Sequence, residues 1–193
     1  NALKNKKHVV TANKALLAKN GMELFQIAEK NKVLLLFEAA VAGGIPIIKT
    51  IKNNIFLSKI KKISGILNGT TNYILTNMFE NNQNFEDVLS DAESKGYTNR
   101  VEAELDIGGL DSAHKLTLLS TVCFGSEIKF INNIVNGISN IDIVDMKNAY
   151  KLGYKIKLIS EAYLLDNQIY CFTGPKLLDI KNSLANVDGV LNA

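Results

Sequence analysis

A lysine and an aspartate near the middle of the chain have the types and the spacing for proton chemistry. Asp111 and Lys115 are four residues apart in the segment DIGGLDSAHKL, residues 106–116. If the chain is helical from Leu110 onward, they share one face. A partly desolvated lysine can exchange a proton with a substrate hydroxyl while a nearby carboxylate orients that substrate. An isolated pair of this kind is also typical of a surface salt bridge worth under about 1 kcal/mol, so both interpretations stay open.

A second lysine could serve a ligand site. Lys14 follows an apolar, β-branched run at residues 7–11, which predicts a buried strand. A lysine at the carboxyl end of a strand lies where open α/β sheets bind their ligands. The alternative is a solvated lysine at the start of a helix.

A carboxylate in an apolar setting is the third candidate. Glu38 lies within VLLLFEAAV, residues 33–41, which predicts a strand covered on both faces. A buried carboxylate is costly unless it is paired or bound to a cation. Gly43 and Gly44, just before Pro46, let the backbone approach a ligand or turn its carbonyls toward an ion. The alternative is a tight turn in which backbone donors satisfy Glu38.

Small polar residues gather in a fourth segment, GILNGTTNY, residues 65–73. At the N-terminus of a helix they would suit an anion such as a carboxylate. A turn with Thr70 as the helix cap explains residues 68–70 equally well.

The elements that must position these residues follow from hydrophobic periodicity, caps and turns. Strands alternate with helices, and a hairpin turns at Asp166–Asn167, so we predict an α+β (α/β) fold with a mixed β-sheet covered by helices. The polar residues 97–108 predict a loop. The expected strands are residues 7–11, 33–41, 60–67, 131–138, 154–164 and 168–173, and the expected helices are residues 16–32 (broken at Asn20–Gly21), 46–53, 70–78, 85–95, 110–124 and 145–152.

The composition excludes several classes of protein. The 193 residues are 47% hydrophobic and 21% charged, which fits one folded domain rather than a disordered chain. The net charge of +3 comes with scattered lysines and no basic run, which argues against a nucleic-acid partner. No stretch approaches the roughly 20 apolar residues of a membrane span. Cys123 and Cys171 have no CxxC or histidine-spaced partner, so we expect buried free thiols in a reducing cytosol.

Taken in order, these segments resemble homoserine dehydrogenases over nearly the whole chain. The likeness runs through VVTANKALLA, EAAVAGGIPI, GILNGTTNYIL, KGY, D-x-x-G-x-D-x-A-H-K, YKIKLI and VDGVLNA. The ordered combination is far more specific than any one motif. The resemblance implies a cytoplasmic, homodimeric enzyme that interconverts L-homoserine and L-aspartate 4-semialdehyde with NADP or NAD, in threonine and methionine biosynthesis.

The resemblance also implies roles for individual residues. Lys115 resembles the catalytic lysine that exchanges the hydroxyl proton, and Asp111 resembles a homoserine-binding carboxylate. Asp106 resembles a second acidic residue of the same pocket. Lys14 resembles the lysine placed between cofactor and substrate, and Gly96 a residue beside the nicotinamide.

A monovalent cation, Na⁺ or K⁺, is a further implication. Glu38, Val41, Gly43 and Ile45 match the family's cation site, where all but Glu38 would supply backbone carbonyls. The cation would then give the buried carboxylate of Glu38 its compensating charge.

One departure from the family concerns the substrate's ammonium group. After Gly-Tyr the family has a glutamate that holds the substrate, but residues 98–106 read TNRVEAELD, one residue longer, with Asn99 at the glutamate position. A neutral Asn99 cannot supply a charged hydrogen bond, worth roughly 1.5–3 kcal/mol, unless Glu102 replaces it. The alternative functions are a non-catalytic interaction or regulatory domain of the same fold, and an oxidoreductase for a different semialdehyde.

The resemblance divides the chain into the end of a dinucleotide-binding domain, residues 1–14, and a catalytic and substrate-binding domain, residues 15–193. The chain begins with Asn1 rather than Met, has no GxGxxG motif and stops before the family's glycine-rich return segment. We expect these 193 residues to fold, but not to reduce NAD(P) with homoserine without the rest of the cofactor domain.

Overall fold

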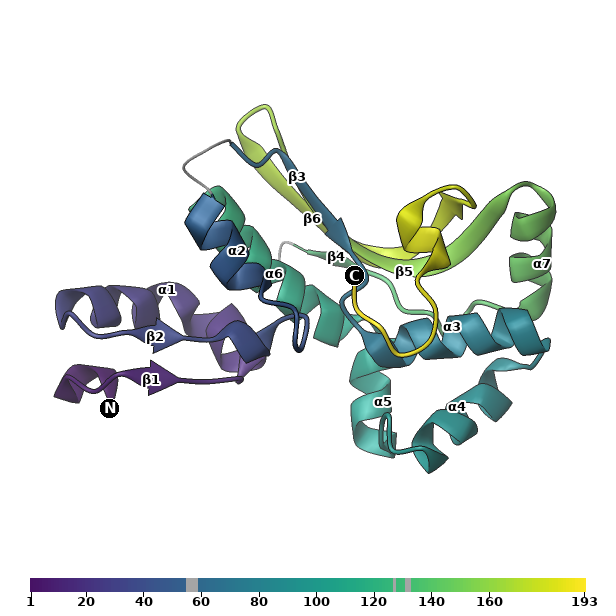
Figure 1. Ribbon diagram of the computed structural model, residues 1–193, viewed down its shortest axis with the longest axis horizontal. Helices are drawn as coiled ribbons and strands as arrows, with labels where there is room; N and C mark the ends of the chain where they lie inside the picture. The colour runs from purple at the N-terminus through teal and green to yellow at the C-terminus, as the bar shows by residue number, and fades with distance from the viewer. Residues whose placement is uncertain (55–58, 127, 131–132) are drawn as a thin grey trace. The chain divides into compact units, whose positions relative to one another are not determined.

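The computed structural model describes residues 1–54, 59–126, 128–130 and 133–193, whose helices and strands are shown in Figure 1. They form two compact units along one chain. Unit 1 comprises Asn1–Ile63, His114–Asn133 and Ala162–Cys171, and unit 2 comprises Ser64–Ala113, Ile134–Glu161 and Phe172–Ala193. Each unit is considered by itself.

Unit 1 begins with two short parallel strands joined by a helix. Its elements are the 3-10 turn η1 (Leu3–Asn5), β1 (Val9–Val10), α1 (Lys14–Lys30), β2 (Leu35–Leu36), the 3-10 turn η2 (Glu38–Ala40) and α2 (Ile47–Asn54). Val9 pairs with Leu35 in the parallel register of β1 and β2. Such a strand–helix–strand connection is the building block of dinucleotide-binding sheets.

Two expectations for unit 1 were wrong. Helix α1 runs unbroken through Asn20–Gly21, because Gly21 is buried and its position leaves room for the ring of Phe25, so packing outweighs the poor helix propensity of glycine. Strand β2 is short, and Glu38 lies in η2 rather than in a strand. Leu36 is 49% exposed, so within the described chain this run is not covered on both faces.

Unit 2 is built around α3. The remaining elements of the chain are β3 (Lys62–Gly65), α3 (Gly69–Asn81), α4 (Phe85–Ser94), α5 (Arg100–Ile107), α6 (Leu110–Phe124), β4 (Ile134–Val135), α7 (Ile143–Lys151), β5 (Tyr154–Leu165), β6 (Gln168–Asp179) and the 3-10 turn η4 (Ser183–Asn186). Helix α6 and strands β3, β5 and β6 continue from one unit into the other. Helix α3 contacts α4, α5 and α7.

The predicted mixed sheet is confirmed. Its four strands lie in the order β3-β5-β6-β4, and β4 pairs with β6 in parallel. Strands β5 and β6 form the predicted hairpin, where Asp166 and Asn167 both have positive φ angles, of 49° and 61°. Two consecutive residues of this kind form the turn whose twist matches that of a hairpin. Residues 131–132 of the expected strand 131–138 lie outside the described residues.

The largest error concerns residues 97–108, which were predicted to form a loop but contain α5. Asn99 caps this helix, since its side-chain oxygen accepts hydrogen bonds from the backbone N–H groups of Val101 and Glu102. Ala103 and Ile107, four residues apart, are the buried positions that attach α5 to the core.

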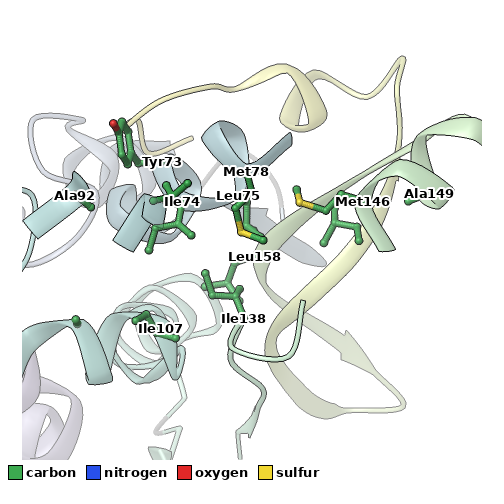
Figure 2. Packing of buried hydrophobic residues seen from close by; sticks show 13 residues of the cluster. Tyr73, Ile74, Leu75, Met78, Ala92, Ile107, Ile138, Met146, Ala149 and Leu158 are labelled. Carbon is green, nitrogen blue, oxygen red and sulfur yellow. The ribbon is translucent and has the colours of Figure 1, made fainter. Parts of the chain in front are cut away.

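The core of unit 2 is an apolar cluster packed around α3. Figure 2 shows Leu75 and Met78 of α3 turned toward Leu158 of β5. The other members labelled there are Tyr73, Ile74, Ala92, Ile107, Ile138, Met146 and Ala149. Since Met78 and Ile74 are fully buried, this packing fixes the position of α3 and of the residue that caps its N-terminus.

Candidate functional site

The N-terminus of α3 holds two carboxylates through one side-chain amide. Asn68, 4% exposed, donates from Nδ2 to Oδ1 of Asp106 at 2.7 Å and to Oδ2 of Asp111 at 3.0 Å. Its Oδ1 accepts from the backbone N–H of Thr71 at 2.8 Å and so caps α3. A single carboxamide therefore caps a helix and brings two acidic side chains together.

The two aspartates come from consecutive helices. Asp106 lies in the last turn of α5 and Asp111 in the first turn of α6. Between them Gly109 has a φ angle of +80°, which favours glycine and reverses the direction of the chain. Asp111 benefits from the positive end of the α6 dipole, whereas Asp106 lies near the negative end of the α5 dipole.

The surroundings of Asp106 change its pKa. Burial raises the pKa of Asp106 above 3.8, and the nearby charge of Asp111 raises it further. Hydrogen bonds from Asn68 and Thr98 oppose this shift without cancelling it. A cationic group beside the two acids would stabilise both ionised forms.

Lys115 lies one helical turn after Asp111 on the unbroken helix α6, as predicted, and is half-buried. The predicted apolar side of this helix is confirmed by Leu116, Leu119 and Cys123, all buried. Cys123 and Cys171 are free and buried, as expected. Burial raises the pKa of the Cys123 thiol to about 11, which suits a packing role.

The segment that follows α4 lies next to the aspartates. Gly96 ends α4 with a φ angle of +72°, and the backbone N–H of Tyr97 bonds to the carbonyl of Ala92. Thr70, predicted to cap α3, instead donates its hydroxyl to the carbonyl of Tyr97 at 3.1 Å. Thr98 then donates to Asp106 at 3.3 Å. The segment after α4 thus contacts Asp106 through Thr98.

Asn99 and Glu102 have different surroundings. The side-chain oxygen of Asn99 lies 3.0 Å from the backbone nitrogen of Glu102, so the cap of α5 uses it. Glu102 is exposed in the first turn of this helix. Their proposed contact with the substrate stays a prediction.

The remaining predicted site residues lie in unit 1. Lys14 is the first residue of α1, after the cap Asn13, whose side chain accepts from the backbone N–H of Leu16. The expected position of Lys14 at the carboxyl end of β1 is therefore correct, as is the alternative of a helix-start lysine. Its contact with a cofactor stays a prediction.

The carboxylate of Glu38 accepts hydrogen bonds from the backbone. Its Oε1 accepts from the N–H of Ile48 at 2.8 Å and its Oε2 from the N–H of Lys49 at 3.0 Å, both at the start of α2. The alternative interpretation, a turn with backbone donors, is the one observed, so this carboxylate does not need a cation for its charge.

The carbonyls proposed for the cation lie in the tight turn before α2. Ala42 and Gly43 both have φ angles of 56°, and the carbonyl of Ile45 accepts from Ile47 N–H at 2.8 Å. Val41 is fully buried. Within the described residues, no group of three or more His, Cys, Asp or Glu side chains could hold a metal.

The sequence did not identify Asn68 and Thr98 as site residues. Asn68 looked like a turn residue, and its bonds to Asp106 and Asp111 join positions 38 and 43 residues apart. The one sequence signal was the gathering of small polar groups at a helix N-terminus. That signal predicted a bound anion such as a carboxylate, whereas the carboxylates that Asn68 holds belong to the chain itself.

Comparison with known proteins gives a consistent result. The family model described as homoserine dehydrogenase matches residues 46–193, and the model described as homoserine dehydrogenase, NAD binding domain, matches residues 1–38. A homoserine dehydrogenase from Neisseria gonorrhoeae is 46% identical over 192 residues, covering 100% of this chain and 44% of the relative.

Solved structures agree with the sequence comparisons. A homoserine dehydrogenase from Thiobacillus denitrificans has a TM-score of 0.94 at 44% identity, covering 98% of this chain and 44% of that one. A hyperthermophilic archaeal homoserine dehydrogenase in complex with NADPH has a TM-score of 0.84 at 27% identity, covering 99% and 54%. The chain spans less than half the length of the curated relative from Neisseria gonorrhoeae. Because the family model matches well over half of its residues, the chain belongs to the homoserine dehydrogenase family.

Proposed function

We propose that the protein interconverts L-homoserine and L-aspartate 4-semialdehyde with NAD(P), in threonine and methionine biosynthesis, and that this chain carries its substrate-binding and catalytic residues. The observation that supports this most directly is the carboxylate pair, Asp106 and Asp111, held by Asn68 at the start of the helix that carries Lys115. Acidic groups of this kind suit the ammonium group of an amino-acid substrate.

The chain's own residues divide the chemistry between them. Asp111 and Asp106 bind the substrate ammonium and so orient its hydroxyl-bearing carbon. Lys115 exchanges the hydroxyl proton as the alcohol becomes an aldehyde, and returns it in the reverse direction. A bound nicotinamide supplies the acceptor or donor of the hydride.

The residues of unit 1 fit a dinucleotide. The parallel pair β1–β2, connected through α1, is the topology that dinucleotide-binding domains use. The match of residues 1–38 to an NAD-binding model, and NADPH in the archaeal relative, support NADP or NAD as cofactor. We assign Lys14 and Gly96 to cofactor contacts. We also keep the division into a dinucleotide-binding part, residues 1–14, and a catalytic part, residues 15–193.

A monovalent cation, Na⁺ or K⁺, is proposed at the carbonyls of Val41, Gly43 and Ile45. The carboxylate of Glu38 already accepts hydrogen bonds from the backbone of α2. The cation site is therefore supported only by the family resemblance and by the tight turn before α2. If the ion binds, the melting temperature of the full-length protein is higher in KCl or NaCl than in choline chloride of equal ionic strength. Equal melting temperatures would rule this site out.

The remaining proposals concern assembly and location. A homodimer in the cytoplasm follows from the family resemblance, and no described helix is both long and apolar enough to cross a membrane. Light scattering of the full-length protein measures the dimer, and a single-subunit mass would contradict it. Fractionation of cells measures the location, and recovery outside the cytoplasmic fraction would contradict it.

The decisive experiment follows NADP reduction by the full-length protein with homoserine. Lys115→Met removes the proton-exchanging group, so kcat falls by about 100-fold or more, with a smaller change in KM. The matched control is Lys147→Met, an exposed lysine on α7, which keeps normal turnover. Unchanged kcat in Lys115→Met would remove the proposed mechanism.

Two other outcomes separate the alternative functions. No turnover by the wild-type protein with any semialdehyde or amino alcohol favours a non-catalytic interaction or regulatory domain. Turnover only with another semialdehyde favours an oxidoreductase of different specificity, and would direct attention to Asn99, where the sequence departs from the family.

A further inference from the structure

A lysine outside the proposed site is almost completely buried. Lys157 lies in β5 and is 2% exposed. Its Nζ is surrounded by oxygen atoms: the carbonyl of Val187 at 2.7 Å, Oδ1 of Asn72 at 3.1 Å, and Thr76 Oγ1 and Asp188 Oδ1 at 3.2 Å each. These acceptors belong to α3 and to the segment after η4, so one ammonium group joins these two parts of the chain.

Burying the charged ammonium of Lys157 costs free energy. Burial lowers its pKa, and the charge of Asp188 only opposes that shift. The Asp188 side chain is 44% exposed, which weakens its compensation. An apolar side chain of similar length would avoid the cost of burying the charge. What the lysine adds is therefore its hydrogen bonds, and the geometry that they impose.

Asn72 completes the connection. This α3 residue is 1% exposed, and its Nδ2 donates to the carbonyls of Val187 and Gly189, both at 2.9 Å, while its Oδ1 accepts from Lys157. Val187 and Gly189 are thus held against α3, and Asp188 between them is held by Lys157 of β5. We call residues 187–193 the C-terminal strap, which Figure 1 shows in yellow next to α3.

The strap continues along the residues that lead into the carboxylate site. A Cβ atom on Gly69 would lie 2.5 Å from the carbonyl oxygen of Val190, so only glycine allows this approach. Ala193 and Ile66 exchange two backbone hydrogen bonds, of 2.6 and 3.0 Å. Asn68 lies between Ile66 and Gly69, and its backbone is therefore held by the strap on both sides.

We propose that Lys157, together with Asn72, is a positioning residue that fastens the strap to α3 and thereby fixes Asn68 beneath Asp106 and Asp111. It touches neither substrate nor cofactor. Its effect on kinetics rests on the proposed function, but its effect on the strap does not.

The test uses the full-length protein with two variants. Lys157→Met removes the ammonium group and keeps the length of the side chain. Asn72→Asp keeps an acceptor for Lys157 but turns a carboxylate oxygen toward two carbonyls. The matched control is Lys155→Met, on the same strand, whose weaker bond to Asn186 lies just before the strap.

Hydrogen exchange of peptides covering residues 187–193 and 66–71 is the first measurement. In both variants these amides exchange about 10-fold faster or more, including the Thr71 amide that Asn68 caps, while α7 is unchanged. Homoserine kinetics is the second: KM rises about 10-fold with a smaller change in kcat, because the carboxylates lose their fixed geometry. The control shows neither effect.

Each result tests one step of the proposal. Unchanged hydrogen exchange in both variants would show that Lys157 and Asn72 do not fasten the strap to α3. Faster exchange at residues 187–193 without a change at residues 66–71, or without a change in KM, overturns the positioning of Asn68. If the wild-type protein does not oxidise homoserine, the proposed function fails. Hydrogen exchange at residues 66–71 still decides whether the strap positions Asn68.

Discussion

Each of the two units contains acidic side chains near the N-terminus of a helix, and the two arrangements differ in how the charge is satisfied. In unit 1 the single carboxylate of Glu38 accepts directly from two backbone N–H groups of α2. In unit 2 Asp106 and Asp111 share the neutral amide of Asn68, which itself caps α3.

In the proposed function, this difference separates a structural carboxylate, Glu38, from a pair of carboxylates that binds the substrate ammonium. Glu38 places one negative charge on two donors at the positive end of a helix dipole, so folding alone satisfies it. The pair in unit 2 places two acids on one amide, and the pKa of Asp106 is raised because burial and Asp111 outweigh the hydrogen bonds. The family resemblance implied a cation beside Glu38, whose charge the backbone of α2 satisfies. In the proposed function the cationic partner is the substrate ammonium, beside Asp106 and Asp111.

Among the variants that compare these two regions, the largest expected effect comes from removing one charge of the pair. In the full-length protein, Asp111→Asn lowers kcat/KM for homoserine by roughly 10- to 100-fold, because a charged hydrogen bond to the ammonium is lost. The fold tolerates the change, since the amide keeps an acceptor for Asn68 and the repulsion with Asp106 disappears. Steady-state kinetics and a thermal melt measure both. A large loss of stability with unchanged kcat/KM would reverse the roles of the two regions.

The sequence predicted one helix of the site well and missed another. Helix α6 was predicted at its observed bounds, Leu110–Phe124, because its apolar side repeats over a long segment. Helix α5 has only two strongly buried apolar positions, Ala103 and Ile107, which is too few for a periodic pattern. Its cap, Asn99 with Glu102 three residues later, was the available signal.

The two aspartates of the pair were predicted, but the amide that holds them was not. Asp111 and Asp106 were named through the family resemblance, but nothing in the local sequence brings Asn68 to them. That contact depends on the packing of α3 against α5 and on the strap, which join positions far apart in the chain. Similarly, the donors to Glu38 come from α2, ten residues later, so the sequence left its partner undecided.

The second prediction tests the other region. Glu38→Gln lowers the free energy of unfolding by about 1 kcal/mol, because a neutral side chain interacts less with the N–H groups and the dipole of α2. The effect on kcat/KM is much smaller than that of Asp111→Asn. Urea unfolding of the full-length protein gives the first quantity. As a control, Glu23→Gln changes an exposed residue in the middle of α1, away from any helix N-terminus. Strong loss of activity without loss of stability would place Glu38 in a ligand site.

The third prediction uses pH. The folded pKa of Asp106 lies above 3.8, so its charge is lost earlier than usual as pH falls. A protonated Asp106 binds an ammonium less well, so KM for homoserine rises as pH falls through that raised pKa, and Asp106→Asn removes this dependence. Stability follows the opposite direction: the contribution of Asp106 is fully present below 3.8 and is lost as pH rises through its folded pKa.

Two titrations check this sign. The difference in unfolding free energy between the wild-type protein and Asp106→Asn should shift in favour of the variant as pH rises over that window. KM should be followed over the same window wherever the protein stays folded. A difference that shifts in favour of the wild type would mean that the folded pKa is lowered rather than raised, and would remove the electrostatic contrast with Glu38.

The smallest effect is expected at Asn99, where capping and substrate binding can be separated. Aspartate caps a helix about as well as asparagine, so Asn99→Asp keeps α5 in place and adds the charge that the family carries here. If the side chain lies near the substrate ammonium, KM for homoserine falls by a few-fold, about 0.5–1 kcal/mol. Asn99→Ala loses the cap instead and costs about 1 kcal/mol of stability. An unchanged KM in Asn99→Asp would make Asn99 a purely structural residue, like Glu38, and would leave the ammonium to Asp106 and Asp111 alone.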